Sequence, residues 1–415
     1  MSLKEILDLG KQPIANGFLA SDEFSKEKFY DLRVGFDEET QQLSLIETPE
    51  KTDMFNDSYV YRSSGSKTML NHFKQLKEKL ERDIVFDSGG LARNFPDKET
   101  LRLMKSDALK ILEIGSNDGA FISNFGTDNT VCVEPCANFA RITKKFGYTT
   151  YTEFWTKELS DKIKDKHGTQ HIIYSSNCMC HIPEIDEAFQ AVSSLLKEDG
   201  IFIFEDPNLE SVIDNLSVDQ IYDEHAHVFS SYFIHQALEK VGMQIWKRET
   251  LGNIHGGSTR FYVIKNNSKI GKLLGVVRPE ERYRSYSTKD LEDWSESVKQ
   301  NLKNLKQELI KFKNKGKHVI AIGATSKSTT IFNYSGIDRS LITYITDSTP
   351  EKQGKFSPGM HIPVISPEVG LNKNVDAVFL SAWNFKDEII KNYSHLLKKD
   401  VQYITHVPQT NVFYA

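Results

Sequence analysis

The sequence predicts an α/β protein with a small N-terminal domain at residues 1–80 and two doubly wound domains at 81–285 and 286–415. Two observations support this. Short, continuously apolar runs alternate with helical patterns in the second block, as expected for a parallel sheet covered by helices on both faces. The same rhythm restarts after Gly316. A chain of 415 residues can bury more than one core.

The first block is short of clear strands and closes with a predicted helix that starts at Lys67. Its apolar residues recur at helical spacing: Met69, Leu70, Phe73, Leu76 and Leu80. The polar, proline-containing stretch 93–98 is a predicted linker.

The second block contains apolar runs at 110–114, 131–134, 171–174 and 201–204, with late, antiparallel candidates at 244–247 and 260–264. A long amphipathic helix follows, with apolar residues at steps of three and four from Leu291 to Phe312. A coiled-coil seam would need more heptads, so we expect this helix to lie along the core of its own domain. The third block has strand patterns at 318–323, 342–346, 377–380 and 401–404.

Composition narrows the class of protein. The net charge of −5 argues against a nucleic-acid binder that works through bulk positive charge. No apolar run approaches the roughly 20 residues that span a bilayer, and the first residues lack the pattern of a signal peptide. Four cysteines do not make a disulfide framework in a chain of this length. We expect a cytoplasmic, globular protein, and a monomer.

The strand at 111–114 runs into a turn that contains Gly115 and Gly119, and the next strand ends in Glu134. Glycines let the backbone approach a ligand at the carboxyl end of a strand, and the acid can accept hydrogen bonds from ribose hydroxyls. The alternative is an ordinary glycine turn. Gly-x-Gly-x-x-Gly is absent, so a dinucleotide would be poorly served.

Acid–base residues gather after the fifth strand. Tyr222, Glu224 and His225 lie within four positions, and His181 follows the fourth strand. An imidazole suits proton abstraction, and a phenol can stabilise a developing oxyanion. A polar surface loop without a catalytic role is one alternative.

A metal site is another alternative, with possible ligands Cys178, Cys180, His181, His225 and His227. Their spacing is not that of structural zinc, so we expect no metal there. Cys132 and Cys136 are expected to be buried small residues.

The turn from Glu113 to Gly119 resembles motif I of the class I S-adenosylmethionine-dependent methyltransferases. The resemblance implies a Rossmann-like domain that binds S-adenosylmethionine, with Glu153 near the adenine and Asn177 facing the same crevice. The residues implied to bind the cofactor are Glu113, Gly115, Asn117, Gly119, Glu134, Pro135, Glu153, Phe154 and Asn177.

The whole chain resembles the three-domain sugar C-methyltransferases of the tetronitrose C-3-methyltransferase type, which act on dTDP-linked 4-keto-deoxysugars. The matching motifs lie at 7–18, 54–55, 59–66, 177–183, 204–207, 219–225, 252–260, 323–328, 347–353 and 357–363. The family usually holds a zinc ion through two cysteine pairs near the N-terminus. This chain has no cysteine there, so we expect no structural zinc.

The resemblance implies S-adenosylmethionine-dependent methylation at C-3, the carbon next to the ketone of a nucleotide-linked sugar. His225 would be the base that forms an enolate, oriented by Glu224. Tyr222 and His181 would contact the keto oxygen or a neighbouring hydroxyl, and Tyr61 would line the cleft.

The C-terminal domain would clamp the sugar nucleotide. A helix N-terminus after a glycine turn presents amides, hydroxyls and an ammonium to phosphate. The residues implied in substrate binding are Ser63, Ser64, Gly323, Thr325, Lys327, Ser328, Lys352 and His361.

Two other functions stay open at this point. One is O- or N-methylation of another small phosphorylated metabolite, and the other is a nucleotide-sugar-binding homologue that is catalytically impaired. A base next to an enolate-stabilising phenol favours carbon methylation, because oxygen and nitrogen nucleophiles need less activation.

Overall fold

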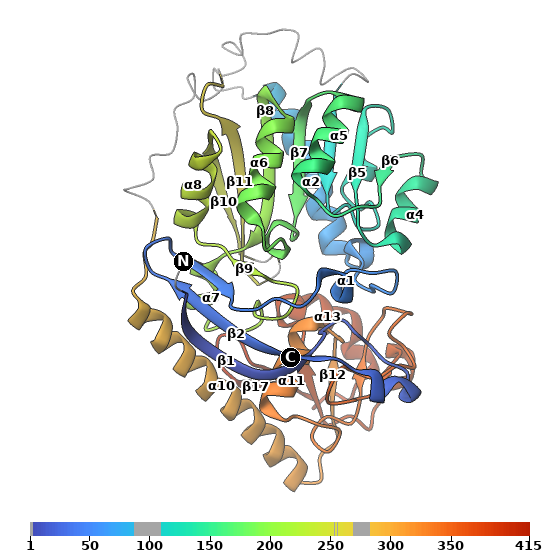
Figure 1. Ribbon diagram of the computed structural model, residues 1–415. Helices are drawn as coiled ribbons and strands as arrows, with labels where there is room; N and C mark the ends of the chain where they lie inside the picture. The colour runs from blue at the N-terminus through green and yellow to red at the C-terminus, as the bar shows by residue number, and fades with distance from the viewer. Residues whose placement is uncertain (1–2, 87–108, 253, 255, 269–282) are drawn as a thin grey trace.

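The computed structural model describes residues 3–86, 109–252, 254, 256–268 and 283–415. Its strands form three sheets (Figure 1), one for each predicted part of the chain. The sheet of the middle part lies at one end of the molecule, and the N-terminal and C-terminal sheets lie together at the other. The predicted linker at 93–98 lies outside the described residues. Within these ranges, no helix is both long and apolar enough to cross a membrane.

The N-terminal part is a four-stranded antiparallel sheet, so the expectation that it lacks clear strands was wrong. It has the order β1 (Lys4–Pro13), β2 (Phe29–Asp37), β3 (Gln42–Leu45), β9 (His227–Val228). Register shifts after Glu5 and Asp8 break the alternation of apolar residues in β1, which hides the strand pattern. β9 comes from the acid–base loop of the second block and pairs with β3.

The middle part is a seven-stranded sheet of order β10-β11-β8-β7-β4-β5-β6. β4, β5, β6, β7 and β8 are parallel, and β11 and β10 are antiparallel as predicted. The bounds are β4 (Ile111–Ile114), β5 (Thr130–Val133), β6 (Thr149–Tyr151), β7 (Gln170–Ser176), β8 (Leu196–Pro207), β10 (Met243–Leu251) and β11 (Ser258–Lys265).

Helices cover both faces of this sheet. One face packs against α5 (Lys157–His167), α6 (Ile185–Leu195) and α8 (Ser231–Lys240). The other packs against α2 (Lys67–Phe86), through Met69, Phe73, Leu76 and Leu80, whereas Leu70 is exposed. The expected domain boundary at residue 80 therefore falls inside a helix that packs on the middle sheet. The shorter helices are α1 (Lys51–Met54), α4 (Ala137–Lys145) and α7 (Leu209–Asp214).

The C-terminal part is a second doubly wound sheet of order β14-β13-β12-β15-β16-β17, parallel except for β17. Its strands are β12 (Val319–Ile322), β13 (Ile345–Thr346), β14 (Val364–Ile365), β15 (Ala377–Leu380), β16 (Gln402–Thr405) and β17 (Asn411–Phe413). Its helices are α10 (Thr288–Asn314), α11 (Ser326–Ser335), α12 (Pro367–Gly370) and α13 (Lys386–Tyr393). The run at 342–346 forms a strand only at its last two residues.

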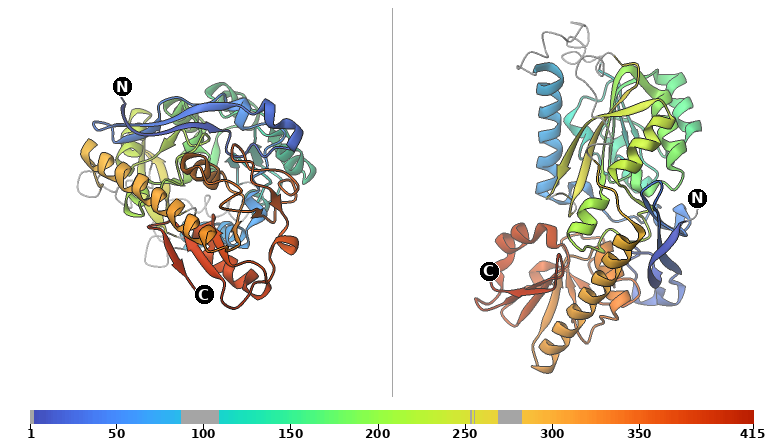
Figure 2. Two further views of the ribbon diagram at one scale, coloured as in Figure 1. Left: turned by 90° about the horizontal axis from the view of Figure 1, so that it is seen from below. Right: turned by 90° about the vertical axis from the view of Figure 1, so that its left-hand side faces the viewer.

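Helix α10 joins the N-terminal and C-terminal parts into one core. Its apolar face, from Leu291 to Phe312, is buried as predicted. That face packs on the C-terminal sheet and also on β1 and β2, which run beside it in Figure 2. Because apolar side chains from both parts share this core, the N-terminal sheet is held by hydrophobic burial.

Candidate active site

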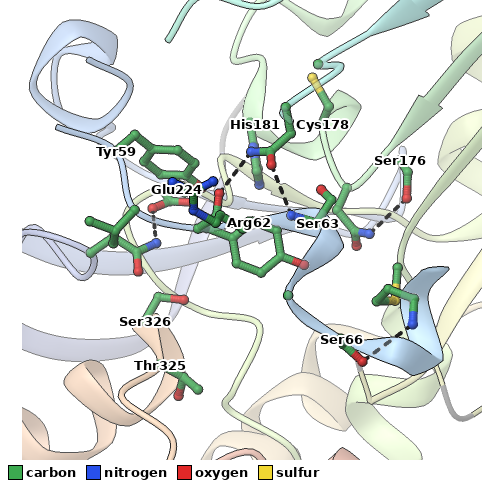
Figure 3. A pocket seen from close by; sticks show the side chains of 18 of the residues that line it. Tyr59, Arg62, Ser63, Ser66, Ser176, Cys178, His181, Glu224, Thr325 and Ser326 are labelled. Carbon is green, nitrogen blue, oxygen red and sulfur yellow. Dashed lines mark hydrogen bonds between the residues drawn. The ribbon is translucent and has the colours of Figure 1, made fainter. Parts of the chain in front are cut away.

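A cavity of about 740 Å³ lies where the three parts meet. The carboxyl ends of β4, β7 and β12 open into it, which is where open α/β sheets bind ligands. Figure 3 shows side chains from each part around it: Tyr59 and Ser63 from the N-terminal segment, His181 and Glu224 from the middle part, and Thr325 and Ser326 from the turn that begins α11.

His225 lies in the loop between α7 and β9, and two hydrogen bonds fix its ring. Its Nδ1 is 2.9 Å from the carbonyl oxygen of Gln220, and its Nε2 is 2.7 Å from the hydroxyl of Tyr222. A carbonyl only accepts, so Nδ1 carries the proton in the neutral ring. Nε2 is therefore the basic nitrogen, and it accepts from the Tyr222 phenol.

The Glu224 carboxylate is held by two residues of the N-terminal segment. Its Oε1 accepts a hydrogen bond of 2.6 Å from the Asn16 amide, and its Oε2 accepts one of 2.8 Å from the Tyr59 hydroxyl. The expectation that Glu224 orients His225 is therefore corrected: the Gln220 carbonyl holds that ring. Burial raises the pKa of Glu224 to about 7, although both hydrogen bonds oppose the rise.

Asn16 and Tyr59 are site residues that the sequence reasoning did not single out. Both lie inside N-terminal segments that carry the family resemblance. Their pairing with Glu224 joins segments far apart in the chain, and no local pattern predicts such a pairing.

His181 and Tyr61 both line the cavity, as expected. The ring of His181 lies 5.1 Å from that of His225 and stacks on Phe55. Burial lowers the pKa of His181 to about 3, so its imidazole is neutral. Tyr61 is partly exposed, and desolvation of its hydroxyl raises the pKa of the phenol, which keeps it a hydrogen-bond donor.

The glycine turn after β4 forms another wall. Gly115 has φ 71°, and a Cβ there would lie 2.7 Å from Cys178 Sγ, so only glycine fits. The Glu134 carboxylate accepts from the amides of Asn117 (2.7 Å) and Cys136 (2.8 Å), and burial raises its pKa to about 7. The expected cofactor residues that line the cavity are Gly115, Asn117, Glu134, Pro135, Phe154 and Asn177.

Three expected cofactor residues are not on this wall. Glu113 is buried within β4. A Cβ on Gly119 would meet Thr143 of α4, so this glycine serves packing. Glu153 forms an exposed ion pair of 2.7 Å with Lys162. The Glu153 carboxylate, which was expected near the adenine, is therefore paired with a neighbouring lysine.

The segment 55–66 covers the glycine turn. The backbone amide of Ser63 donates to Asn117 Oδ1 (3.0 Å), and the Asn138 amide donates to the carbonyl of Tyr59 (2.8 Å). Ser63 lines the cavity. Ser64, expected to bind substrate, instead donates its hydroxyl to Asp118 (2.5 Å) and is not part of the wall.

The C-terminal part contributes the turn between β12 and α11. Gly323, Thr325, Ser326 and Lys327 line the cavity. Thr325 is the N-cap of α11 and is paired with Ser328, so the Ser328 hydroxyl is committed to capping rather than to the wall. The Lys327 ammonium is desolvated, which lowers its pKa, and faces the Asp219 carboxylate.

Lys352 and His361 have different surroundings. Lys352 lines the cavity, donates to the Ala324 carbonyl (2.7 Å) and lies over the Phe18 ring. His361 stacks on Phe24 at 3.7 Å and pairs with Glu27 at 2.9 Å. It lies off the cavity wall, so it joins the C-terminal and N-terminal parts and does not contact the site.

Three of the five possible metal ligands are brought together. One ligand atom each of Cys180, His181 and His225 lie within 4.8 Å of one another. His227 is directed elsewhere, to Ser44 and to the carbonyl of Ile182. All four cysteines, at 132, 136, 178 and 180, belong to the middle part of the sequence.

The chain is similar to known methyltransferases in both of its larger parts. Residues 87–248 match a family described as a methyltransferase domain. Residues 253–408 match a family described as a C-methyltransferase C-terminal domain. C-methyltransferase NovU of Streptomyces niveus is 26% identical over 420 residues, which cover 99% of this chain and 94% of that protein.

Two solved structures are also similar. Magnesium protoporphyrin IX methyltransferase of Synechocystis PCC 6803 has a TM-score of 0.32 and 10% identity, covering 48% of this chain and 84% of its own. A methyltransferase of Archaeoglobus fulgidus has a TM-score of 0.32 and 16% identity, covering 55% of this chain and 86% of its own.

Proposed function

From the premise that the chain belongs to the S-adenosylmethionine-dependent C-methyltransferases, we propose that it methylates C-3 of a nucleotide-linked 4-keto-deoxysugar. The observation that carries this proposal is the His225–Tyr222 pair, which lies in a cavity bounded by both glycine turns. A base next to a phenol is suited to forming an enolate from a ketone.

The wall at β4 and β5 fits the cofactor. Gly115 leaves space that a Cβ would fill, and the Glu134 carboxylate at the end of β5 can accept hydrogen bonds from a ribose diol. Gly115, Asn117, Glu134, Pro135, Phe154 and Asn177 would hold the cofactor. When bound, S-adenosylmethionine supplies a methyl group on a sulfonium, which a carbanion can attack without metal assistance.

The base acts through a defined tautomer. His225 Nε2 takes the proton from the carbon next to the ketone, and the resulting imidazolium donates Nδ1–H to the Gln220 carbonyl. Tyr222 then donates its hydroxyl hydrogen bond to the oxygen on which negative charge develops. His181, which burial keeps neutral, binds a neighbouring oxygen of the sugar.

The far wall would hold the nucleotide diphosphate. Thr325, Lys327 and Lys352 line the cavity beside the start of α11. Helix N-termini and ammonium groups favour phosphate. Glu224, held by Asn16 and Tyr59, would bind a sugar hydroxyl between the two ends.

The test is to incubate purified protein with a panel of nucleotide-linked 4-keto-6-deoxysugars in deuterium oxide, with and without S-adenosylmethionine, and to analyse the sugars by mass spectrometry. We expect deuterium wash-in without the cofactor and the gain of one methyl on a sugar carbon with it. His225→Asn should lower both rates by at least about 100-fold, because a general base contributes roughly 10²–10⁴-fold.

Binding of S-adenosylmethionine to the His225→Asn variant serves as the control and should be unchanged. Normal turnover of this variant would refute the assignment of His225. Bound cofactor with neither wash-in nor methylation on any keto-sugar would refute the substrate class.

A further inference from the structure

We propose that Cys180, His181 and His225 form a binding site for a soft divalent cation such as Zn²⁺, and that its occupation inhibits the enzyme by capturing the base. The site is a place for reversible inhibition, not for a catalytic metal. The inhibition rests on the proposed function of His225, whereas the binding of the cation does not.

The geometry is close to that of a three-ligand metal site. Cys180 and His181 belong to the 3-10 helix η4 (Met179–His181) that follows β7, and His225 faces them from the loop before β9. Their ligand atoms lie within 4.8 Å of one another. Around a tetrahedral ion with Zn–S of about 2.3 Å and Zn–N of about 2.0 Å, ligand atoms lie roughly 3.5 Å apart. A shift of about 1 Å would therefore close the site.

His181 provides an unused ligand atom. Its Nε2 is buried and has no hydrogen-bond partner within the described ranges, although buried polar atoms are nearly always paired. Coordination would satisfy this nitrogen.

His225 is already oriented as a metal ligand would be. Its Nδ1–H is held by the Gln220 carbonyl, so Nε2, which accepts the hydrogen bond of the Tyr222 hydroxyl, is the nitrogen that can coordinate a cation. Metal-bound histidines are commonly fixed in this way, by a backbone carbonyl on the second nitrogen. Tyr222 would release its hydrogen bond to Nε2 when the cation binds.

The residue types select the cation. One thiolate and two imidazoles favour Zn²⁺ or Co²⁺ over Mg²⁺ and Ca²⁺, which prefer oxygen ligands. The cation would arrive through the cavity, since His181 and His225 line it while Cys180 is buried behind them. As the metal–sulfur bond forms, the Cys180 S–H bond breaks and its proton is released to solvent. The fourth position faces the cavity and can hold water.

The binding test uses full-length, metal-free protein titrated with Co²⁺ and followed by absorption spectroscopy. We expect one Co²⁺ per chain, with tetrahedral visible bands and a thiolate-to-cobalt charge-transfer band that Zn²⁺ abolishes. Cys180→Ser should remove the charge-transfer band and weaken binding by at least about 10-fold. Cys178→Ser is the matched control, because it removes a neighbouring thiol outside the trio, and it should keep the band.

The inhibition test measures deuterium wash-in at increasing Zn²⁺. Wild type and Cys178→Ser should lose wash-in, and a chelator should restore it, whereas Cys180→Ser should need at least about 10-fold more Zn²⁺. A charge-transfer band that is missing in wild type, or unchanged in Cys180→Ser, would overturn the site. If wild type shows the band but exchanges no keto-sugar proton without metal, the proposed function fails and the site stands.

Discussion

Glu134 is a buried acid whose ionisation we expect to control cofactor binding. Burial raises the pKa of Glu134 to about 7. In the ionised carboxylate both oxygens accept hydrogen bonds, so each can accept one from a ribose hydroxyl, whereas the protonated acid carries a donor on one oxygen. The affinity for S-adenosylmethionine should therefore weaken as the pH falls from 8 to 6. Isothermal titration calorimetry across this range measures the effect.

Glu134→Gln is the matched control for this prediction. It should bind S-adenosylmethionine about 10-fold more weakly at pH 8, because a hydrogen bond to a charged group contributes roughly 1.5–3 kcal/mol. Its affinity should vary little with pH. A variant whose affinity follows the same pH dependence as wild type would show that another group controls binding.

The same raised pKa has a consequence for stability. The folded protein holds the Glu134 proton more tightly than the unfolded chain does. The protonated carboxyl therefore contributes to the free energy of unfolding fully below the pKa of the unfolded chain, and this contribution is lost as the pH rises through about 7. In the absence of cofactor, Glu134→Gln should therefore gain Tm relative to wild type between pH 5.5 and pH 8. A difference in Tm that shrinks or stays constant over this range would contradict the prediction.

At the scale of elements, a buried ion cluster docks α2 on the middle sheet. Glu205 of β8 lies 2.6 Å from His72 of α2 and 2.6 Å from Arg260 of β11, and all three are buried. Arg260→Met would leave Glu205 without its permanent counter-charge. Breaking a buried pair in this way costs about 3–5 kcal/mol, which chemical denaturation can measure.

Arg33→Met is the comparison for this loss. Arg33 pairs with Glu5 and Glu47 at the surface, where an ion pair contributes at most about 1 kcal/mol. Equal losses of stability in the two variants would show that the Arg260 cluster does not dock the helix.

The first residue of helix α11, Ser326, lines the same cavity as Tyr222. The Ser326 side chain lowers the pKa of the Tyr222 phenol and so opposes the rise that burial causes. Ser326→Ala should therefore slow deuterium wash-in by up to about 10-fold, because the Tyr222 phenol loses a neighbour that lowers its pKa, and one pKa unit corresponds to about a factor of ten. Ser326→Thr should restore the rate, and neither variant should alter cofactor affinity. Wash-in at the wild-type rate in Ser326→Ala would exclude Ser326 from a role in proton abstraction.

The elements that the sequence predicts well are those with local patterns. The parallel strands β4, β5, β7 and β8 each contain a short apolar run, and α10 repeats its apolar residues at helical spacing. The N-terminal sheet was missed because bulges interrupt β1 and because β9 comes from a distant part of the chain. Its side chains face a helix that follows much later in the sequence.

In the candidate site, too, the sequence predicts the residues that depend on local patterns and misses those that depend on distant contacts. Residues placed by a strand end, such as Glu134 and Asn177, reach the cavity because the carboxyl ends of parallel strands share one edge. Side-chain pairings across segments could not be predicted, and they decide the remaining residues. Glu224 is turned toward Asn16, Glu153 toward Lys162, and His361 toward Glu27.

At the scale of the whole molecule, one apolar core joins the N-terminal and C-terminal parts. Leu7, Val34, Trp294 and Phe332 belong to the same buried cluster. We therefore predict that the N-terminal sheet needs no metal, and that a chelator leaves the Tm unchanged. The measurement is best made on the Cys180→Ser variant, in which a cation bound by Cys180, His181 and His225 no longer contributes to the Tm. Release of zinc together with a fall in Tm would contradict it.

Because β9 pairs with β3, the N-terminal sheet can be completed during synthesis only after β9 has been made. Strands β1, β2 and β3 leave the ribosome first, but the edge of β3 stays open until the whole parallel part of the middle sheet has been made. The backbone groups along the edge of β3 therefore stay unpaired while most of the middle domain is translated. Such an edge can pair with other chains or be bound by chaperones. Pairing this edge requires the residues next to His225, so the N-terminal sheet is completed only in chains that already contain the loop with Tyr222 and His225.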